Sequence, residues 1–232
     1  FYMYLAHTLG IERGKPFAPT EAQKAALMAG LTSGEAVAKT LVFNERLEGV
    51  LRKDGWRVIL SGSLPDAFEH TQRVRDFDML DPRSRFTYEA ITSSPRMGHP
   101  VTGKGQAYAG MFEDSDDNRL LGSGKYVMRF NPTPPAELFW SVVVYDVESR
   151  TLIVNETQNA TVGSRATPDL QTNEDGSVDI YVGPTPPPGK ESNWVQSVPG
   201  RGWFPYVRMY GPGADWFDED AFALPKIEKT DW

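Results

Sequence analysis

The residues best suited to chemistry are charged side chains that interrupt apolar or aromatic segments. Asp146 ends an apolar run, Glu191 lies in a polar loop, and Arg208 is the only charge in an aromatic segment. A carboxylate can take a proton and a guanidinium can bind an anion, provided that both reach one substrate. For an enzyme we predict these catalytic residues: Asp146 or Glu191 as general base, Arg208 or Lys190 as anion clamp, and Tyr145 as proton donor.

Large aromatic residues surround these charges in the sequence. A pocket with aromatic walls and a few polar groups is typical of small-molecule sites, and aromatic faces suit sugar rings. The same residues are equally at home in a core, where the charges would form ion pairs that include Arg129 and Asp179, because an isolated buried charge is costly. The predicted ligand-binding residues are Trp140, Tyr181, Lys190, Asn193, Trp194 and Tyr210.

Metal and cofactor motifs are incomplete or absent. His7, His70 and His99 are far apart, and the chain has no cysteine. Residues 122–125 lack the first glycine and the Ser/Thr of a phosphate loop. The acidic residues 114–118 lack the glycine and glutamate of a calcium loop, so they predict a solvated turn. There is no Gly-x-Ser-x-Gly nucleophile elbow either. We expect no bound metal and no cofactor.

The stretch 177–212 positions most of the predicted site. Residues 178–182 alternate apolar and polar side chains, as a half-buried strand does. The prolines and glycine of residues 186–189 impose a rigid corner, and a second turn leads into a strand over 203–210. We expect the loop between the two corners to fold back so that Trp194 packs on the strand 203–210, holding its polar neighbours at one end of the fold.

The beginning of the chain has helical signals. Thr20 and Thr32 each start a capping box, in which a Thr hydroxyl and a Gln or Glu side chain bond the first helical amides reciprocally. These two signals predict two antiparallel helices within residues 20–46, joined at Gly30. A further helix is predicted from Asp81 or Ser84 to Thr92.

From residue 106 the apolar period changes to two, which indicates strands. An Asn-Glu-Asp-Gly sequence at residues 173–176 predicts a tight turn. Seven or eight strands at this spacing predict a mainly β fold, a jelly-roll-like antiparallel sandwich over residues 105–232 with a helical and mixed N-terminal segment, 1–104, packed on it. The predicted strands are 56–60, 106–112, 125–130, 138–147, 151–155, 178–182 and 203–210.

Several of these segments resemble a known family in their order along the chain. The motifs are GKPF at residues 14–17, FWS at 139–141, GKESNW at 189–194, GWFPYVRMYGP at 202–212 and LPKIE at 224–228. Together they resemble the bacterial domain-of-unknown-function family 1214, the C-terminal region of proteins that often also carry a family 1254 domain. The resemblance implies a jelly-roll-like sandwich and no particular reaction. Phe222 departs from the tryptophan expected there, which keeps an apolar anchor but loses an N–H donor.

Charge and composition exclude some function classes. The formal charge of −7 argues against nucleic-acid binding, which uses a basic surface. No apolar run approaches the roughly 18 residues of a membrane span. The absence of cysteine is compatible with cytoplasm or periplasm. The chain starts at Phe1, so we interpret it as a processed or incomplete product.

Two functions from different classes are left. The first is a non-catalytic module of the bacterial envelope, periplasmic or secreted, that binds a small molecule or a protein partner as a homo-oligomer. The second is a hydrolase or lyase that acts on a small carbonyl or carbohydrate compound in an aromatic-lined cleft. Convergence of Asp146, Glu191 and Arg208 in one cleft would favour the enzyme.

Overall fold

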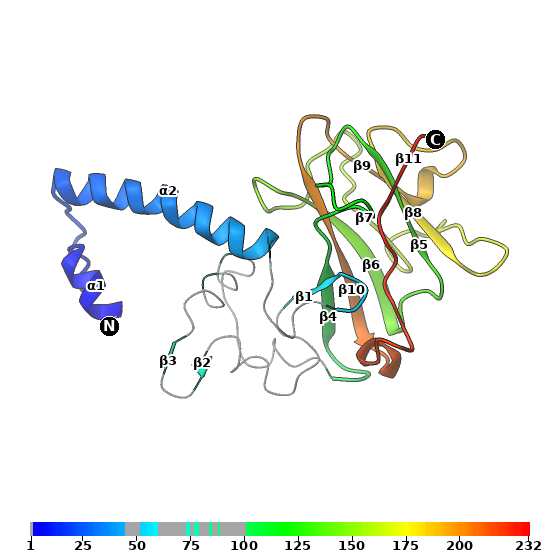
Figure 1. Cartoon of the computed structure of the whole chain (residues 1–232), viewed down its shortest axis with the longest axis horizontal. Helices are drawn as coiled ribbons and strands as arrows, with labels where there is room; N and C mark the ends of the chain where they lie inside the picture. The colour runs from blue at the N-terminus through cyan, green and yellow to red at the C-terminus, as the bar shows by residue number, and fades with distance from the viewer. Residues whose placement is uncertain are drawn as a thin grey trace.

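The chain is described by a computed structural model over residues 2–44, 52–59, 73–74, 77–78, 84, 88 and 101–232. Within these residues, two N-terminal helices precede a body made of two packed β-sheets (Figure 1). The mainly β prediction with an N-terminal helical segment is therefore confirmed. No helix in the described part combines the length and apolar character that a membrane span requires.

The helical start consists of α1 (Tyr2–Thr8) and one long helix, α2 (Glu21–Phe43). The capping box at Thr20 is confirmed: its hydroxyl accepts from Gln23 N at 3.2 Å, and Gln23 Oε1 accepts from Thr20 N at 2.8 Å. The prediction of two helices joined at Gly30 is wrong. A glycine inside a helix costs only about 1 kcal/mol, and the Thr32 hydroxyl bonds the carbonyl of Met28 one turn earlier instead of capping a new helix.

The first sheet has five strands in the order β1-β4-β10-β6-β7, all antiparallel. The longest two strands, β6 and β10, lie side by side. The strand bounds are β1 Arg57–Ile59, β4 Gln106–Gly110, β6 Ala136–Asp146, β7 Thr161–Gly163 and β10 Trp203–Pro212.

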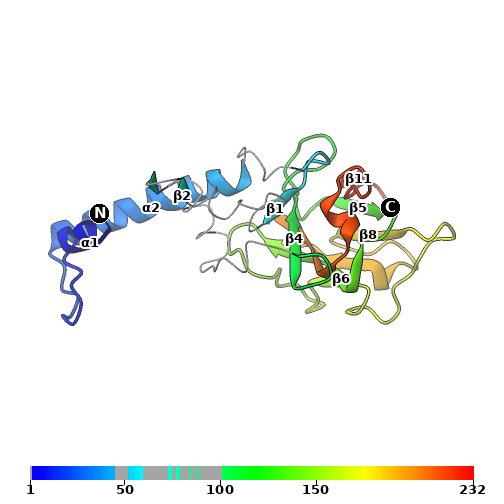
Figure 2. The same ribbon diagram turned by 90° about the horizontal axis from the view of Figure 1, so that it is seen from below.

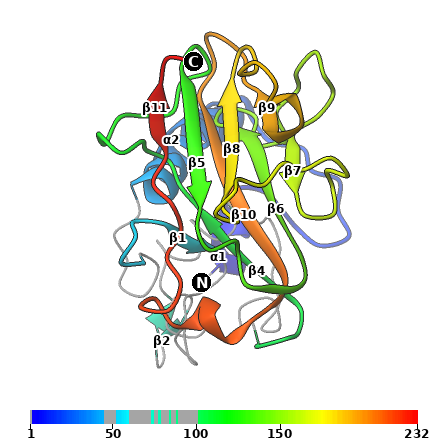
Figure 3. The same cartoon turned by 90° about the vertical axis from the view of Figure 1, so that its right-hand side faces the viewer.

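The second sheet has four strands in the order β11-β5-β8-β9, and Figure 3 shows it in front of the first. The pair β8-β9 is parallel and the other pairs are antiparallel. The strand predicted over residues 151–155 is reduced to a single bridge between Leu152 and Tyr145. The strand bounds are β5 Lys125–Phe130, β8 Val178–Gly183, β9 Trp194–Gln196 and β11 Glu228–Thr230.

Turns predicted from glycine and aspartate occur where expected. Asn173 N donates to Ser177 O, and Gly176 has a φ of +82°, so the Asp-Gly sequence makes its turn just before β8. Asp114 Oδ1 accepts from the backbone amides of Asp116 and Asn118, which closes the acidic turn. Both turns stabilise themselves with their own side chains.

Other predicted segments are described only in part. Of the helix predicted up to Thr92, the described residues Ser84 and Tyr88 are helical, and the rest lies outside the described residues. His70 and His99 lie there too. Two short strands, β2 (Arg73–Val74) and β3 (Phe77–Asp78), pair with each other.

The core lies between the two sheets and is rich in aromatic residues. Along each long strand, alternate side chains enter it: Trp203, Val207 and Met209 of β10 are all at most 1% exposed. Since the side-chain period of a strand is two, their neighbours on β10 must lie on the other face of the sheet. That face carries the candidate site.

Residues 52–59 belong to the body although they precede it by some fifty positions. Strand β1 extends the first sheet through β4. Arg52 is buried, donates to the carbonyls of Trp216 and Phe222, and pairs with Asp54 at 3.1 Å. The indole N–H of Trp56 donates to Pro225 O at 2.8 Å. These contacts clamp the segment to the connection between β10 and β11.

Helix α2 touches the body only with its last turns, and Figure 2 shows the rest of it extending away. Val42 is buried, and the Phe43 ring lies edge-on to Phe112 and Phe204, with centroids 4.8 and 5.6 Å away. Arg119 donates to the Phe43 carbonyl at 3.0 Å, which satisfies one of the free carbonyls at the helix end. The helix therefore covers one end of the first sheet.

Candidate functional site

The side of the first sheet that faces away from the core carries an unusual set of aromatic side chains. We call it the outer face. On β10 it presents Phe204, Tyr206, Arg208 and Tyr210, which alternate with the core residues. The cross-strand register places residues of β4 and β6 beside them: Tyr108, Phe139, Ser141, Val143 and Tyr145.

Glycine makes room for one of these rings. Gly110 of β4 is the cross-strand partner of Tyr206, and a Cβ at Gly110 would lie 2.7 Å from the Tyr206 ring. Any larger residue would push the ring aside. The end of the outer face nearest α2 is filled by packed rings of Tyr145, Phe204 and Tyr206, with centroids 4.9 to 5.6 Å apart.

Arg208 lies in the middle of the outer face, and its surroundings are aromatic. Its Nη2 donates to Tyr108 Oη at 3.4 Å, and its Cζ lies 5.0 and 5.6 Å from the ring centroids of Tyr108 and Tyr210. Its Nε is buried and has no hydrogen-bond partner, and no carboxylate pairs with it among the described residues. Ser141 is its cross-strand neighbour on β6.

The tyrosines beside Arg208 keep their protons. Burial raises the pKa of Tyr108 and of Tyr145 above the ordinary value of 10.0, although the charge of Arg208 opposes the rise in both cases. A protonated phenol can donate a hydrogen bond to an anion. The outer face thus offers a fixed cation and neutral O–H donors.

The predicted general base Asp146 is not in this arrangement. It shares the strand parity of Trp140, Val142 and Val144, so it faces the core side of β6 while Arg208 faces the outer side. Its carboxylate pairs with Arg201 and accepts from Ser149 N at 2.8 Å and Ser149 Oγ at 3.1 Å. The hydrogen bond from Arg201 holds its pKa at about 2, below the ordinary 3.8. Such a carboxylate is a weak base.

The predicted loop residues Lys190, Glu191 and Asn193 lie between β8 and β9 of the other sheet. Glu191 is exposed and accepts from Gly189 N at 3.0 Å. Asn193 is buried: its Nδ2 donates to the carbonyls of Gln171 and Asp179, and its Oδ1 accepts from Gln171 N at 2.8 Å. Asn193 therefore fastens two loops together, and its polar atoms are already used.

The predicted aromatic residues separate into three places. Trp140 is buried in the core beside Phe130. Tyr181 and Trp194 are partners on β8 and β9, and Tyr210 lies on the outer face. The expectation that Trp194 packs on the strand 203–210 is wrong. Its neighbour Val195 enters the core between the sheets, so Trp194 lies on the other face of β9, where its indole N–H donates to Gly183 O at 2.9 Å.

The alternative of structural ion pairs holds for three of the four charges that interrupt apolar strands. Arg129 and Asp179 are cross-strand partners on β5 and β8, joined by two parallel hydrogen bonds of 2.7 and 3.0 Å. Arg129 is 59% exposed, so the pair has a surface position. Asp146 and Arg201 form a second such pair. Arg208 is the one of these four strand charges that ion pairing within the described residues does not explain.

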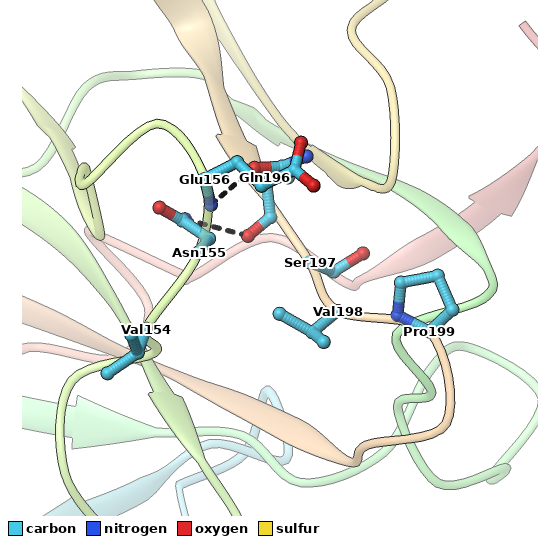
Figure 4. Close-up of a pocket in the computed structure, with 7 residues that line it drawn as sticks. All are labelled: Val154, Asn155, Glu156, Gln196, Ser197, Val198 and Pro199. Carbon is cyan, nitrogen blue, oxygen red and sulfur yellow. Dashed lines mark hydrogen bonds between the residues drawn. The ribbon is translucent and has the colours of Figure 1, made fainter.

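A pocket of about 290 Å³ opens elsewhere, between residues 154–156 and residues 196–199 (Figure 4). Asn155 donates to Gln196 O at 2.9 Å, and Glu156 N donates to Gln196 Oε1 at 3.0 Å, so these polar groups hold the walls together. The remaining lining is mostly apolar, from Val154, Val198 and Pro199. No cation lines it, and it offers less specific recognition than the outer face.

No group of three or more potential metal-ligating side chains occurs in the part of the chain that the structure describes. The outer-face residues that sequence reasoning missed include Tyr108, Phe139 and Ser141. Tyr108 and Ser141 join the site only through the register of three antiparallel strands. In the sequence, the indication of these residues was that the segments of β4 and β6 each place polar residues between apolar ones.

Comparisons with known proteins show similarity to uncharacterised proteins. Residues 105–214 match the family described as "Protein of unknown function (DUF1214)". No curated protein sequence matches the chain. The crystal structure of the VPA0106 protein from Vibrio parahaemolyticus is similar, with a TM-score of 0.52 and 22% identity over 99% of this chain and 50% of that one. This likeness concerns the fold.

A second crystal structure, of an uncharacterized protein from Burkholderia cenocepacia, has a TM-score of 0.36 and 15% identity, covering 99% of this chain and 49% of that one. The chain therefore spans about half the length of both solved proteins.

Proposed function

We propose that this chain, whose residues 105–214 match the DUF1214 family, is a binding module that holds a small anionic molecule on the outer face of its first sheet. Arg208 binds the acidic group, and the hydroxyls of Tyr108 and Tyr145 stand beside it as donors. The observation that carries the proposal is the buried Nε of Arg208, which has no hydrogen-bond partner.

Desolvation explains why this observation points to a ligand. A buried donor without a partner costs about 1–3 kcal/mol, and more when the group is charged. Native proteins leave few such groups, and a missing ligand is one explanation for an exception. A carboxylate or phosphate oxygen supplies what a guanidinium needs, two parallel acceptors in its plane.

A binding function agrees better with the described residues than the hydrolase or lyase prediction does. That prediction needs a carboxylate within reach of the anion clamp. Asp146 lies on the opposite face of β6, and Glu191 lies in the other sheet. Binding of a protein partner, assembly into a homo-oligomer and a periplasmic or secreted location stay predictions.

The first prediction concerns Arg208. Benzoate should bind the wild-type protein saturably in isothermal titration calorimetry, and Arg208→Gln should weaken binding by ~10-fold or more, because a charge-assisted hydrogen bond is lost. Arg208→Lys should retain part of the affinity. Equal benzoate binding by the wild type and Arg208→Gln would overturn the proposal.

A matched control removes the same charge elsewhere. Lys229 is exposed on β11, in the other sheet. Lys229→Gln should bind benzoate as the wild type does. A loss equal to that in Arg208→Gln would mean that net charge, and not the site, governs binding.

A further inference from the structure

A second arginine lies beside the outer face, next to an aromatic pair that also contacts Arg208. Phe139 and Tyr210 are cross-strand partners, and their rings stack with centroids 4.1 Å apart and planes 19° from parallel. Arg208 lies 5.6 Å from the Tyr210 ring, and Arg165 lies 5.5 Å from the Phe139 ring. The stacked pair therefore has a guanidinium near each of its two rings.

Apart from its contact with the Phe139 ring, Arg165 makes no interaction among the described residues that would stabilise the fold. It is exposed, follows β7, and forms no ion pair or hydrogen bond among the described residues. Glu137 lies on the same strand as Phe139. It is nevertheless placed beside Gly103 and pairs with neither arginine within the described residues. Two cations thus flank the aromatic pair with no carboxylate bound to them.

We infer that the ligand of this site carries two acidic groups separated by a flat apolar middle. One acidic group binds Arg208, the other binds Arg165, and the middle lies along the edges of the stacked rings. The inference rests on the proposed function and narrows it from anions in general to elongated dianions of the dicarboxylate class.

The stacked rings limit how far apart the two acidic groups of the ligand can be. Three successive spacings of 5.5, 4.1 and 5.6 Å lead from Arg165 over the two rings to Arg208, so they set an upper limit on the separation of the two guanidinium groups. Aromatic ring edges carry partial positive charge, so they tolerate an anion better than ring faces do.

The test compares two probes that differ by one carboxylate. Biphenyl-4,4′-dicarboxylate and biphenyl-4-carboxylate share the same apolar middle. In isothermal titration calorimetry the wild type should bind the dicarboxylate ~10-fold more tightly, since a second charge-assisted contact is formed. Arg165→Gln should abolish this preference, so that the two probes bind with similar affinity, whereas Arg165→Lys should restore part of the preference.

The outcomes separate this inference from the proposed function. Equal binding of both probes by the wild type, with Arg208→Gln weakening both, would overturn the two-anion inference and leave the Arg208 site in place. Phe139→Leu keeps both arginines but removes one of the two stacked rings. A loss of the dicarboxylate preference in this variant would support a ligand that lies along these rings. No binding of either probe by the wild type would overturn both proposals.

Discussion

Asp146, at the end of β6, and Arg208, in the middle of the neighbouring strand β10, have opposite surroundings. Asp146 accepts five hydrogen bonds, two of them from Arg201. Arg208 has a weak contact with one phenol and a buried Nε with none. A side chain whose polar atoms are all satisfied within the protein holds structure, and one with an atom left over is available to a ligand.

The second prediction follows from the satisfied carboxylate. Because the pKa of Asp146 is lowered from 3.8 to about 2, its stabilising effect is present above pH 3.8 and is lost as the pH falls through about 2. The contribution is at most about 2 kcal/mol, since the partner Arg201 is 48% exposed and solvent screens it. Asp146→Asn should remove it, measured by urea unfolding at pH 6 and at pH 2.5.

Asp116 supplies the control for this measurement. It is an exposed carboxylate in the acidic turn, and its side chain has no partner among the described residues. Asp116→Asn should leave the free energy of unfolding nearly unchanged at both pH values. The interpretation of Asp146 fails if Asp146→Asn unfolds with the same pH dependence as the wild type.

At the scale of an element, α2 is a continuous helix, and little of its surface packs against the described rest of the protein. Met28, Leu31 and Val37 are each more than half exposed. Its continuity through Gly30 and Gly34 means that local helix propensity and the Thr20 cap must stabilise most of its length. Substitutions in the middle of α2 should therefore follow helix propensity.

The third prediction concerns two glycines whose backbone conformations differ. Gly30 is helical with open space around it, so Gly30→Ala should stabilise α2 by up to about 1 kcal/mol, seen as slower amide hydrogen exchange in the helix. Gly14 has a φ of +79°, so Gly14→Ala should strain its turn. Faster exchange in Gly30→Ala would instead support a break in the helix at Gly30.

The elements themselves were predictable where one face is buried. The strand over residues 125–130 was predicted with its observed bounds, because its alternation matches a sheet with one side in the core. The helix break predicted at Gly30 does not exist, because the residues of a capping box can also lie inside a continuous helix. The site was predictable only in part: Arg208, Tyr145 and Tyr210 share the outer face, but their neighbours Tyr108 and Phe139 depend on strand register.

At the scale of the whole molecule, the body extends beyond residues 105–214. The clamp at residues 52–56 and the connection over 214–227 close one end of the two sheets. The fourth prediction is that Trp56→Ala costs about 3–5 kcal/mol in the free energy of unfolding, because a fully buried indole is removed.

A conservative variant separates the two contributions of this residue. Trp56→Phe keeps most of the buried ring and loses the hydrogen bond to Pro225 O, so it should cost less than Trp56→Ala in urea unfolding. Wild-type stability in Trp56→Ala would show that residues 52–59 are not part of the folded unit.

The central position of β10 has a consequence for how the chain is made. β10 lies between β4 and β6, yet it is the last of the three to leave the ribosome. Until residue 212 has emerged, β4 and β6 each have an unpaired edge and an uncovered apolar face, the features that promote association with other chains. Long-range pairing of this kind also slows folding. The protein should therefore depend on chaperones during synthesis more than its finished sheet, in which β4 and β6 are paired on both sides, suggests.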